Sequence, residues 1–289
     1  MAICDTAKRV TTGHLNTSKG LASANCFASQ AAAQRYARVR PQYHPQAVRW
    51  ICEAAGVENL GRVLDVGCGT GHSTMALAGV AQSVLGVDAS SAMLALAPEA
   101  GNVRYLQCQA EAMDFAPASF DLVVAASAMH WLKPKAFLER VRKILIPGGH
   151  LAIYNDHFTA TMLGNPECKL WLRTRLARRF PPLRGLRDLD EAAAAAEGFS
   201  VAARGSFNHA VTYTRQEFAD FLLTRSNTLA KISDSQESAS LAEQWILDEL
   251  AAFLPAEGGE FLFKCNLWLL SQTATLPSKR DSSERGQSI

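Results

Sequence analysis

The sequence predicts an α/β fold in which helices cover both faces of a mostly parallel sheet. Short apolar segments alternate with segments of helical spacing between residues 62 and 154. The strand segments are apolar along most of their length, which is typical of strands buried on both faces. A glycine-rich turn follows the first strand, where open α/β sheets bind ligands. These observations place the expected site at the carboxyl ends of the strands.

Five strands are expected first, at 62–66, 83–87, 103–108, 120–125 and 150–154. Apolar residues at helical spacing predict the helices between them, at 72–81, 90–97 and 135–145. Upstream, a helix at 34–39 must end before Pro41, because proline restricts the residue that precedes it. Another helix begins at Pro45.

The strand–helix alternation stops after Asn155. Helices are expected at 168–180, 188–197, 216–223 and 238–253, strand in part of 199–213, and a last sheet strand at 260–270. The predicted organisation is a disordered leader (1–29), a cofactor-binding core with an amino-terminal flap (30–155), a helical lid or substrate insertion (156–258), the final sheet strand (259–271) and a flexible tail (272–289).

Composition excludes several classes of protein. The formal net charge is +2 and 48% of the residues are hydrophobic, so no nucleic-acid-binding surface is predicted. No apolar run reaches the roughly 18 residues of a membrane span. The 7 cysteines are scattered, which favours reduced thiols in a cytoplasmic protein and no metal site. The first 30 residues, with Asp5 as their one acid, are interpreted as a disordered leader or an organelle transit peptide.

The glycine turn carries the predicted binding chemistry. Gly67, Gly69 and Gly71 follow Asp65 at alternate positions, between a strand and a helix. Glycines permit the tight turn and let a ligand approach the backbone. The amides of the following helix can receive negative groups. A nicotinamide dehydrogenase would require the spacing G-x-G-x-x-G, which this turn lacks.

Asp88 supports a nucleoside ligand. It ends the second strand, 23 positions after Asp65. An acid near this spacing suits the two hydroxyls of an adenosine ribose. The alternative is that Asp88 caps the next helix.

Together these segments resemble the class I methyltransferase domain of type 11, in the group that includes trans-aconitate, ubiquinone-biosynthesis and malonyl-acyl-carrier-protein methyltransferases. The matching segments are LDVGCGTG, VLGVDASSAML, QAEAMDF, SFDLVVAASAMHWL and VRKILIPGGHLAIY. The resemblance implies a Rossmann-like fold with a seven-stranded, mostly parallel sheet, and S-adenosyl-L-methionine as the cofactor. The segment RYARVRPQYHP resembles the flap that covers the cofactor in trans-aconitate-type relatives, and it contains Tyr36 and Arg40.

The resemblance assigns roles to individual residues. Asp65 and Gly67 would lie at the methionine end of the cofactor, and Gly69 and Gly71 would shape the turn. Asp88 would hold the ribose. Residues expected around the adenine are Ala89, Met93, Gln109, Ala110 and Glu111, and those expected near the reacting methyl group are Ser127 and His130.

His130 and Trp131 have two interpretations each. His130 is either a hydrogen-bonded structural residue or a catalytic one. Trp131 either packs its loop or stabilises the sulfonium through its aromatic face.

The function predicted is methyl transfer to a small molecule, with O-methylation of a carboxylic acid favoured. N- or C-methylation, and cofactor binding without catalysis, remain alternatives. A carboxylate is ionised at neutral pH and needs no base, whereas an amine or phenol would need one, and His130 or His157 would be candidates.

Overall fold

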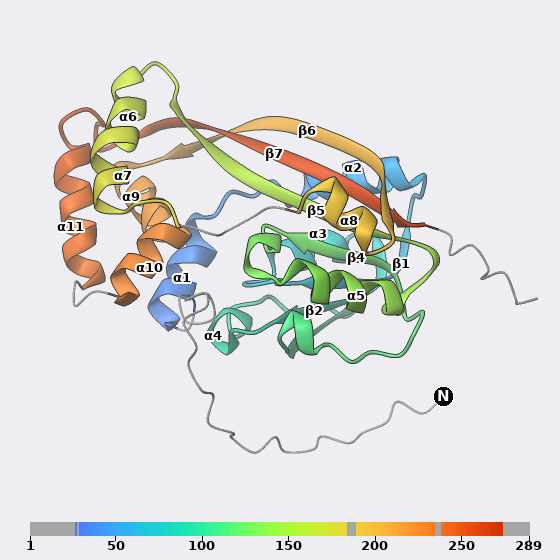
Figure 1. Ribbon diagram of the computed structural model, residues 1–289. Helices are drawn as coiled ribbons and strands as arrows, with labels where there is room; N and C mark the ends of the chain where they lie inside the picture. Colours follow the sequence, from blue (N-terminus) through green and yellow to red (C-terminus); the bar gives the residue numbers. More distant parts are fainter. Residues whose placement is uncertain (1–26, 28, 184–188, 235–237, 274–289) are drawn as a thin grey trace, which may run out of the picture.

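The protein is described by a computed structural model that covers residues 27, 29–183, 189–234 and 238–273. A seven-stranded sheet forms its centre (Figure 1), in the order β3-β2-β1-β4-β5-β7-β6. The strands are β1 (Leu60–Val66), β2 (Ala81–Asp88), β3 (Val103–Gln107), β4 (Phe120–Ala126), β5 (Leu145–Met162), β6 (Phe199–Tyr213) and β7 (Gly259–Gln272).

Strands β1 to β5 pair in parallel, and β7 pairs antiparallel with both β5 and β6. The predicted Rossmann-like fold with a mostly parallel sheet of seven strands is therefore confirmed. Parallel pairing brings the carboxyl ends of β1, β2 and β4 to one edge of the sheet, where the glycine turn lies.

Helices cover both faces, as expected. One core contains α2 (His44–Ala55) and α3 (His72–Ala78) against β1, β2 and β4. The core on the other face contains α5 (Pro134–Ile144) and α8 (Glu191–Ala196). Apolar residues of α5 recur at helical spacing and are fully or almost fully buried, namely Phe137, Leu138, Val141 and Ile144.

Strands β5 and β6 are longer than the sequence predicts. β5 has 18 residues and includes the Pro147-Gly148-Gly149 segment as well as residues 156–162, which were expected in the lid. β6 is strand over all of its 15 residues. β7 lies between them and pairs along nearly its whole length with both, so backbone hydrogen bonds extend the two strands.

The helices outside the sheet surround the far ends of β5, β6 and β7 (Figure 1). The strand β6 divides these helices into two segments of the chain. Both segments share a hydrophobic core with Met162, Phe261 and Phe263 of the strands. These helices are α6 (Pro166–Trp171), a π-helical turn (Leu172–Leu176), α7 (Ala177–Arg179), α9 (Arg215–Leu223), α10 (Ser226–Asp234) and α11 (Ala239–Leu250).

The amino-terminal helix α1 (Gln30–Val39) packs against α9. Arg35 Nε and Arg38 Nη2 donate to the two carboxylate oxygens of Asp220, at 2.8 and 2.7 Å. The Asp220 side chain is buried. The ion pairs fix the helical part of the predicted flap, whose segment spans residues 35–45, on α9.

Several helices differ from the sequence expectation. α1 begins at Gln30 instead of residue 34, and α4 (Ser91–Leu94) is shorter than the predicted 90–97. α10 was not predicted as a helix. No helix in the described ranges is long and apolar enough to cross a membrane. Most of the predicted leader and tail lies outside the described residues, so those assignments, like the cytoplasmic location, stay predictions.

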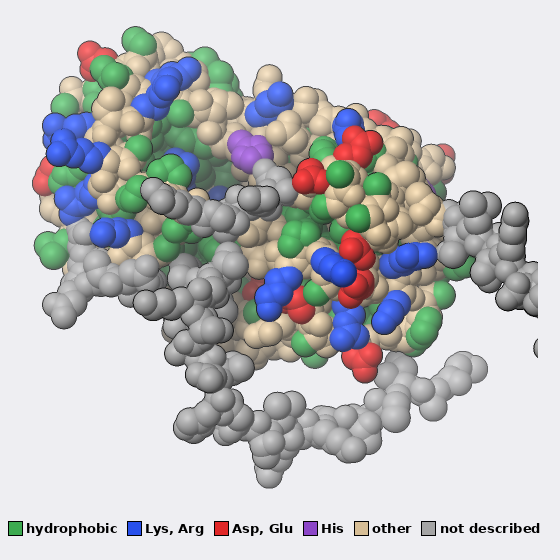
Figure 2. All heavy atoms as spheres, viewed as in Figure 1, with side chains coloured by type: hydrophobic (Ala, Val, Ile, Leu, Met, Phe, Trp, Pro, Cys, Tyr) green, Lys and Arg blue, Asp and Glu red, His purple; other side chains and the backbone are tan. Residues whose placement is uncertain are grey.

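The charged residues are unevenly distributed over the face seen in Figure 2. Basic side chains gather over the helical end of the molecule, around α6 and α7, where Lys169, Arg173, Arg175 and Arg178 lie. Acidic and basic side chains are mixed over α5 and α8. A continuous basic surface of the kind that follows a nucleic-acid backbone is not seen on this face.

Candidate functional site

The glycine turn adopts the left-handed backbone that its sequence predicts. The φ angles of Gly67, Gly69 and Gly71 are 70°, 55° and 80°. A Cβ atom added at Gly67 would lie 2.6 Å from the Cβ of Ala128. Glycine is therefore required at Gly67 both by its dihedral angles and by the close approach of the loop after β4.

A cavity of about 350 Å³ opens beside this turn. It is large enough for part of a nucleoside-sized ligand. Its wall combines the turn after β1, the ends of β2 and β3, the loop after β4 and the amino-terminal segment. The predicted site residues found on it are Tyr36, Gly67, Gly69, Asp88, Ala89, Met93, Gln109, Ala110, Glu111, Ser127 and Trp131.

Asp88 joins the second strand to the glycine turn. Its Oδ2 accepts from the amide of Gly69 at 2.9 Å, and its Oδ1 accepts from the amide of Ser90 at 2.8 Å. Burial raises the pKa of Asp88, and these backbone donors act in the opposite direction. The N-cap of α4 is Ser90, whose side chain accepts from the amide of Met93, so the capping alternative for Asp88 is not what the structure shows.

Asp65 lies behind the turn and does not line the cavity. Its side chain is fully buried, and Oδ2 accepts from the hydroxyls of Ser73 at 2.6 Å and Thr74 at 2.7 Å. Oδ1 has no hydrogen-bond partner in the described part of the chain. Burial raises the pKa of Asp65 to about 6. Gly71 is also absent from the cavity wall and begins α3 instead.

Ser127 occupies a strained backbone position. Its φ is 50°, which is uncommon for a residue with a side chain. Its amide donates to the carbonyl of Tyr154 at 2.7 Å, and its Oγ lies 2.9 Å from the hydroxyl of Tyr43. Strain of this kind tends to concentrate at functional sites. Here it holds Ser127 on the wall of the cavity beside the glycine turn.

Tyr43 belongs to a polar aromatic cluster that sequence analysis missed. Its ring stacks on His44 and on His209, with centroids 4.2 and 5.7 Å apart. His209 Nε2 lies 2.9 Å from Asp156 Oδ1, and the amide of Asp156 donates to Ser127 Oγ at 3.3 Å. These residues come from β5, β6 and the start of α2, so no local motif could reveal them.

A second cavity, of about 360 Å³, lies between the core and the helical part. His130 and Arg40, which are absent from the first cavity, line this one together with Tyr36, Trp131 and Ser127. The structure therefore divides the predicted site residues between two cavities. Tyr36, Ser127 and Trp131 line both.

Two arginines lie on the wall of this second cavity. Arg40 donates to the hydroxyl of Thr224 at 3.0 Å and to its carbonyl at 2.7 Å, and its guanidinium lies over the ring of Tyr36. Arg225 follows α9, and burial together with the nearby Arg40 lowers its pKa. Among the described residues, neither arginine forms an ion pair. Asp156 also lines the cavity, but its Oδ1 is paired with His209.

Phe27 closes the two cavities from one side. Phe27 falls within the predicted leader, yet its ring packs edge-on against Tyr36 and Trp131 at centroid distances of 5.7 and 5.9 Å. Its carbonyl accepts from the hydroxyl of Ser90 at 2.8 Å. Trp131 therefore packs against an aromatic residue of the amino-terminal segment, Phe27.

Comparison with known proteins identifies the domain that carries this site. Residues 64–153 match the methyltransferase domain family. An uncharacterized methyltransferase of Mycobacterium tuberculosis is 36% identical over 119 residues, which cover 41% of this chain and 47% of the relative. A ubiquinone biosynthesis O-methyltransferase of Pseudomonas fluorescens is 34% identical over 135 residues, which cover 44% of this chain and 55% of the relative. The chain spans about half the length of the curated relatives it matches.

Solved structures with the same fold include an Anaeromyxobacter dehalogenans protein provisionally assigned as a type II methyltransferase. It has a TM-score of 0.60 and 24% identity, and the match covers 81% of this chain and 97% of that one. A phosphoethanolamine N-methyltransferase of Haemonchus contortus, solved with S-adenosyl-L-methionine, has a TM-score of 0.51 and 20% identity over 88% of this chain and 61% of its own. At these identities the similarity shows the fold alone.

The strand order and the glycine turn thus define a Rossmann-like nucleoside-binding domain. Residues 64–153 carry an S-adenosylmethionine-dependent methyltransferase domain, as the sequence resemblance predicts. The cofactor of this class is S-adenosyl-L-methionine. The trans-aconitate-like subgroup stays a prediction.

Proposed function

We propose that the protein transfers a methyl group from S-adenosylmethionine to a small acidic molecule, by O-methylation of its carboxylate. The observation that supports this most directly is the junction of the two cavities at Ser127. The cofactor-side cavity contains Asp88 and the glycine turn. The neighbouring cavity contains Arg40 and Arg225. A donor site and an anion-binding wall thus share a boundary.

The residues of the first cavity fit the cofactor. The carboxylate of Asp88 accepts from the amides of Gly69 and Ser90, and its two oxygens have about four lone-pair sites, so acceptor capacity remains for ribose hydroxyls. Met93 and Ala89 offer apolar contacts to a purine, and Gln109 has an amide that can bond its edge. When bound, the cofactor supplies an electrophilic methyl group on a sulfonium.

Arg40 and Arg225 would bind and orient the acceptor carboxylate. A guanidinium forms paired hydrogen bonds with a carboxylate. Arg225 is half-buried, and a charge withdrawn from water is costly unless an opposite charge accompanies it. An acidic acceptor would supply that charge. Because a carboxylate is ionised at neutral pH, the protein would need to align it and exclude water, without removing a proton.

Tyr36, Trp131 and Phe27 would exclude water from the reacting groups. All three line both cavities, and Tyr36 and Trp131 each pack against Phe27. The helical segments around the second cavity would determine which acceptor enters it, as is expected of the predicted lid. The proposal also includes a small-molecule substrate and no nucleic-acid partner, in keeping with the near-neutral net charge.

Replacing Asp88 tests the assignment of the cofactor cavity. We expect Asp88→Ala to weaken binding of S-adenosylhomocysteine by about 1.5–3 kcal/mol, the usual range for a hydrogen bond that involves a charged group. Titration calorimetry measures the change. Asp114→Ala, at an exposed position that does not line the cavity, is the control. Unchanged affinity in Asp88→Ala would remove the ribose assignment.

N- or C-methylation is the alternative, and His130 tests it. His130 and His157 line the second cavity and could act as bases for an amine or phenol. For a carboxylate acceptor, we expect His130→Ala to lower the rate only modestly and to keep its pH profile near neutrality. For an amine or phenol, loss of a general base would cost roughly 10²–10⁴-fold and remove a titration near the histidine pKa.

The proposed activity itself is tested by transfer of a labelled methyl group from S-adenosylmethionine. The acceptors to be compared are carboxylic acids, amines and phenols. Label in a base-labile methyl ester would support the proposal, and label in amines or carbon would support the alternative. Tight cofactor binding without turnover on any acceptor would favour a non-catalytic binding protein.

A further inference from the structure

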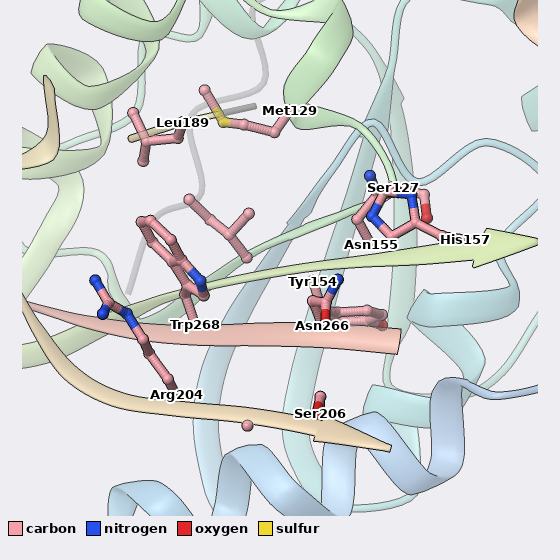
Figure 3. A pocket seen from close by; sticks show the side chains of 12 residues that line it. Ser127, Met129, Tyr154, Asn155, His157, Leu189, Arg204, Ser206, Asn266 and Trp268 are labelled. Carbon is pink, nitrogen blue, oxygen red and sulfur yellow. The ribbon is translucent and has the colours of Figure 1, made fainter. Parts of the chain in front are cut away.

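A third cavity beside Ser127 is larger than the two described above, and the proposal above does not use it. Its volume is about 580 Å³, within the range of small-molecule sites, and it lies on one face of β5, β6 and β7 (Figure 3). The face of a central sheet is normally covered by helices. Four of its lining residues, Met129, Leu189, Ile153 and Trp268, belong to or pack against the hydrophobic core that contains α5 and α8, so the cavity borders that core.

The register of the three strands gives this cavity two different ends. Asn155, Asn266 and Ser206 form one cross-strand row, and all three are polar. The next row, toward α5 and α8, contains Ile153 and Trp268. Figure 3 shows the indole of Trp268 projecting from the sheet into the cavity, on the side where Met129 and Leu189 form the opposite wall. The cavity is therefore polar at one end and apolar and aromatic at the other.

The charge of Arg204 is already engaged at the apolar end. Its guanidinium lies 4.9 Å from the centroid of the Trp268 ring, and it pairs with Glu191. It covers one face of the indole and is not arranged to receive a second anion. The apolar end is thus suited to an uncharged, flat group, which would gain burial and aromatic contact there.

The polar end connects this cavity with the site already described. Ser127, Asn155 and His157 line both the large cavity and the one that contains Arg40 and Arg225. In Figure 3 these three side chains lie together at one end of the large cavity, away from Trp268. A molecule can therefore extend from the arginines past Ser127 to the indole.

We infer that the large cavity binds the aromatic body of the methyl acceptor. The acceptor is accordingly an aryl-substituted carboxylic acid, with its carboxylate at Arg40 and Arg225 and its ring beside Trp268. This inference rests on the proposed function and names the substrate class. The amide and hydroxyl groups of Asn155, Asn266 and Ser206 bind polar substituents between the two ends.

Two methionines provide separate reporters for the test. Met129 lines the large cavity, and Met93 lines the cofactor cavity. With methyl-labelled methionine, and with assignments from Met129→Leu and Met93→Leu, we expect phenylacetate to shift the Met129 signal through the ring current of its phenyl group. Acetate, which has no ring, should leave that signal in place. S-adenosylhomocysteine should shift the signal of Met93.

A substitution that fills the large cavity with a bulky side chain provides the second part of the test. Ser206 and Asn208 are both exposed and lie two residues apart on the same face of β6, but only Ser206 lines the cavity. We expect Ser206→Trp to raise the apparent Kd of phenylacetate, measured from the Met129 signal, about tenfold or more, equivalent to about 1.4 kcal/mol. Asn208→Trp should leave it unchanged.

Absence of a Met129 response to saturating phenylacetate, or an equal response in Ser206→Trp, would overturn the inference. The Met93 response to S-adenosylhomocysteine decides the cofactor assignment independently. Failure of the aromatic subsite and failure of the proposed function therefore give different results. In the labelled-methyl assay, aryl acids should also be methylated with a higher kcat/KM than aliphatic acids, and Ser206→Trp should remove that preference mainly through KM.

Discussion

Arg225→Met is expected to lower kcat/KM for the acidic acceptor by about 30-fold to several thousand-fold. This range corresponds to the 2–5 kcal/mol that truncation of one member of a buried charge pair typically costs. Arg225 faces the second cavity in a partly buried position, and Arg40 is its neighbouring cation. Methionine keeps much of the side-chain length but removes the charge and every hydrogen-bond donor.

The measurement is steady-state transfer of labelled methyl to the acid identified in the acceptor comparison. Arg173→Met, at an exposed position in the helical part, is the matched control and should keep normal activity. Binding of S-adenosylhomocysteine should be unaffected in Arg225→Met, because Arg225 does not line the cofactor cavity. Retention of full activity on an acidic acceptor in Arg225→Met would refute the assignment of the anion-binding wall.

The second large effect concerns stability as a function of pH. His44 is buried, its Nδ1 lies 3.0 Å from the hydroxyl of Tyr154, and burial together with the neighbouring His72 lowers its pKa to about 3. The folded state therefore resists protonation of His44. Its contribution to stability is complete above pH 6.5 and is lost as the pH falls toward 3, by about 1.4 kcal/mol per pH unit.

Asp65 acts in the opposite direction. Burial raises its pKa from 3.8 to about 6, so the folded state holds the proton more tightly than the unfolded chain. Its contribution is complete below pH 3.8 and is lost as the pH rises through 6, again by about 1.4 kcal/mol per unit. Between pH 4 and pH 6 the effects of His44 and Asp65 on the free energy of unfolding therefore cancel.

Asp65→Asn should expose the effect of His44. We expect the free energy of unfolding of this variant to fall, relative to the unaltered protein, by about 3 kcal/mol as the pH is lowered from 6 to 4. Denaturant unfolding at several pH values, without cofactor, measures the difference. Asp248→Asn, at an exposed position, is the control. Parallel pH profiles for Asp65→Asn and the unaltered protein would show that Asp65 does not titrate in this range.

The sequence alone predicted the class of fold and many of the residues that line the cavity beside the glycine turn. This was possible because the relevant residues lie in short, contiguous segments at the ends of β1 to β4. Gly67 and Gly69 are specified by local backbone requirements, and Asp88 by its spacing from the turn. Each such signal depends on a few neighbouring residues, and parallel strands then bring their carboxyl ends together at one edge.

The tertiary structure decided the acceptor side of the site. Tyr43, Asp156 and His209 meet because β6 returns to the sheet beside β7. Asp156 and His209 are 53 positions apart, and no periodicity in the sequence predicts their contact. The same pairing extends β5 beyond Asn155, where the sequence predicts the start of the lid. Arg225 reaches the cavity only because α9 packs on α1. Local sequence patterns determine backbone geometry, whereas these side chains are brought together by strand pairing and helix packing over long separations in the chain.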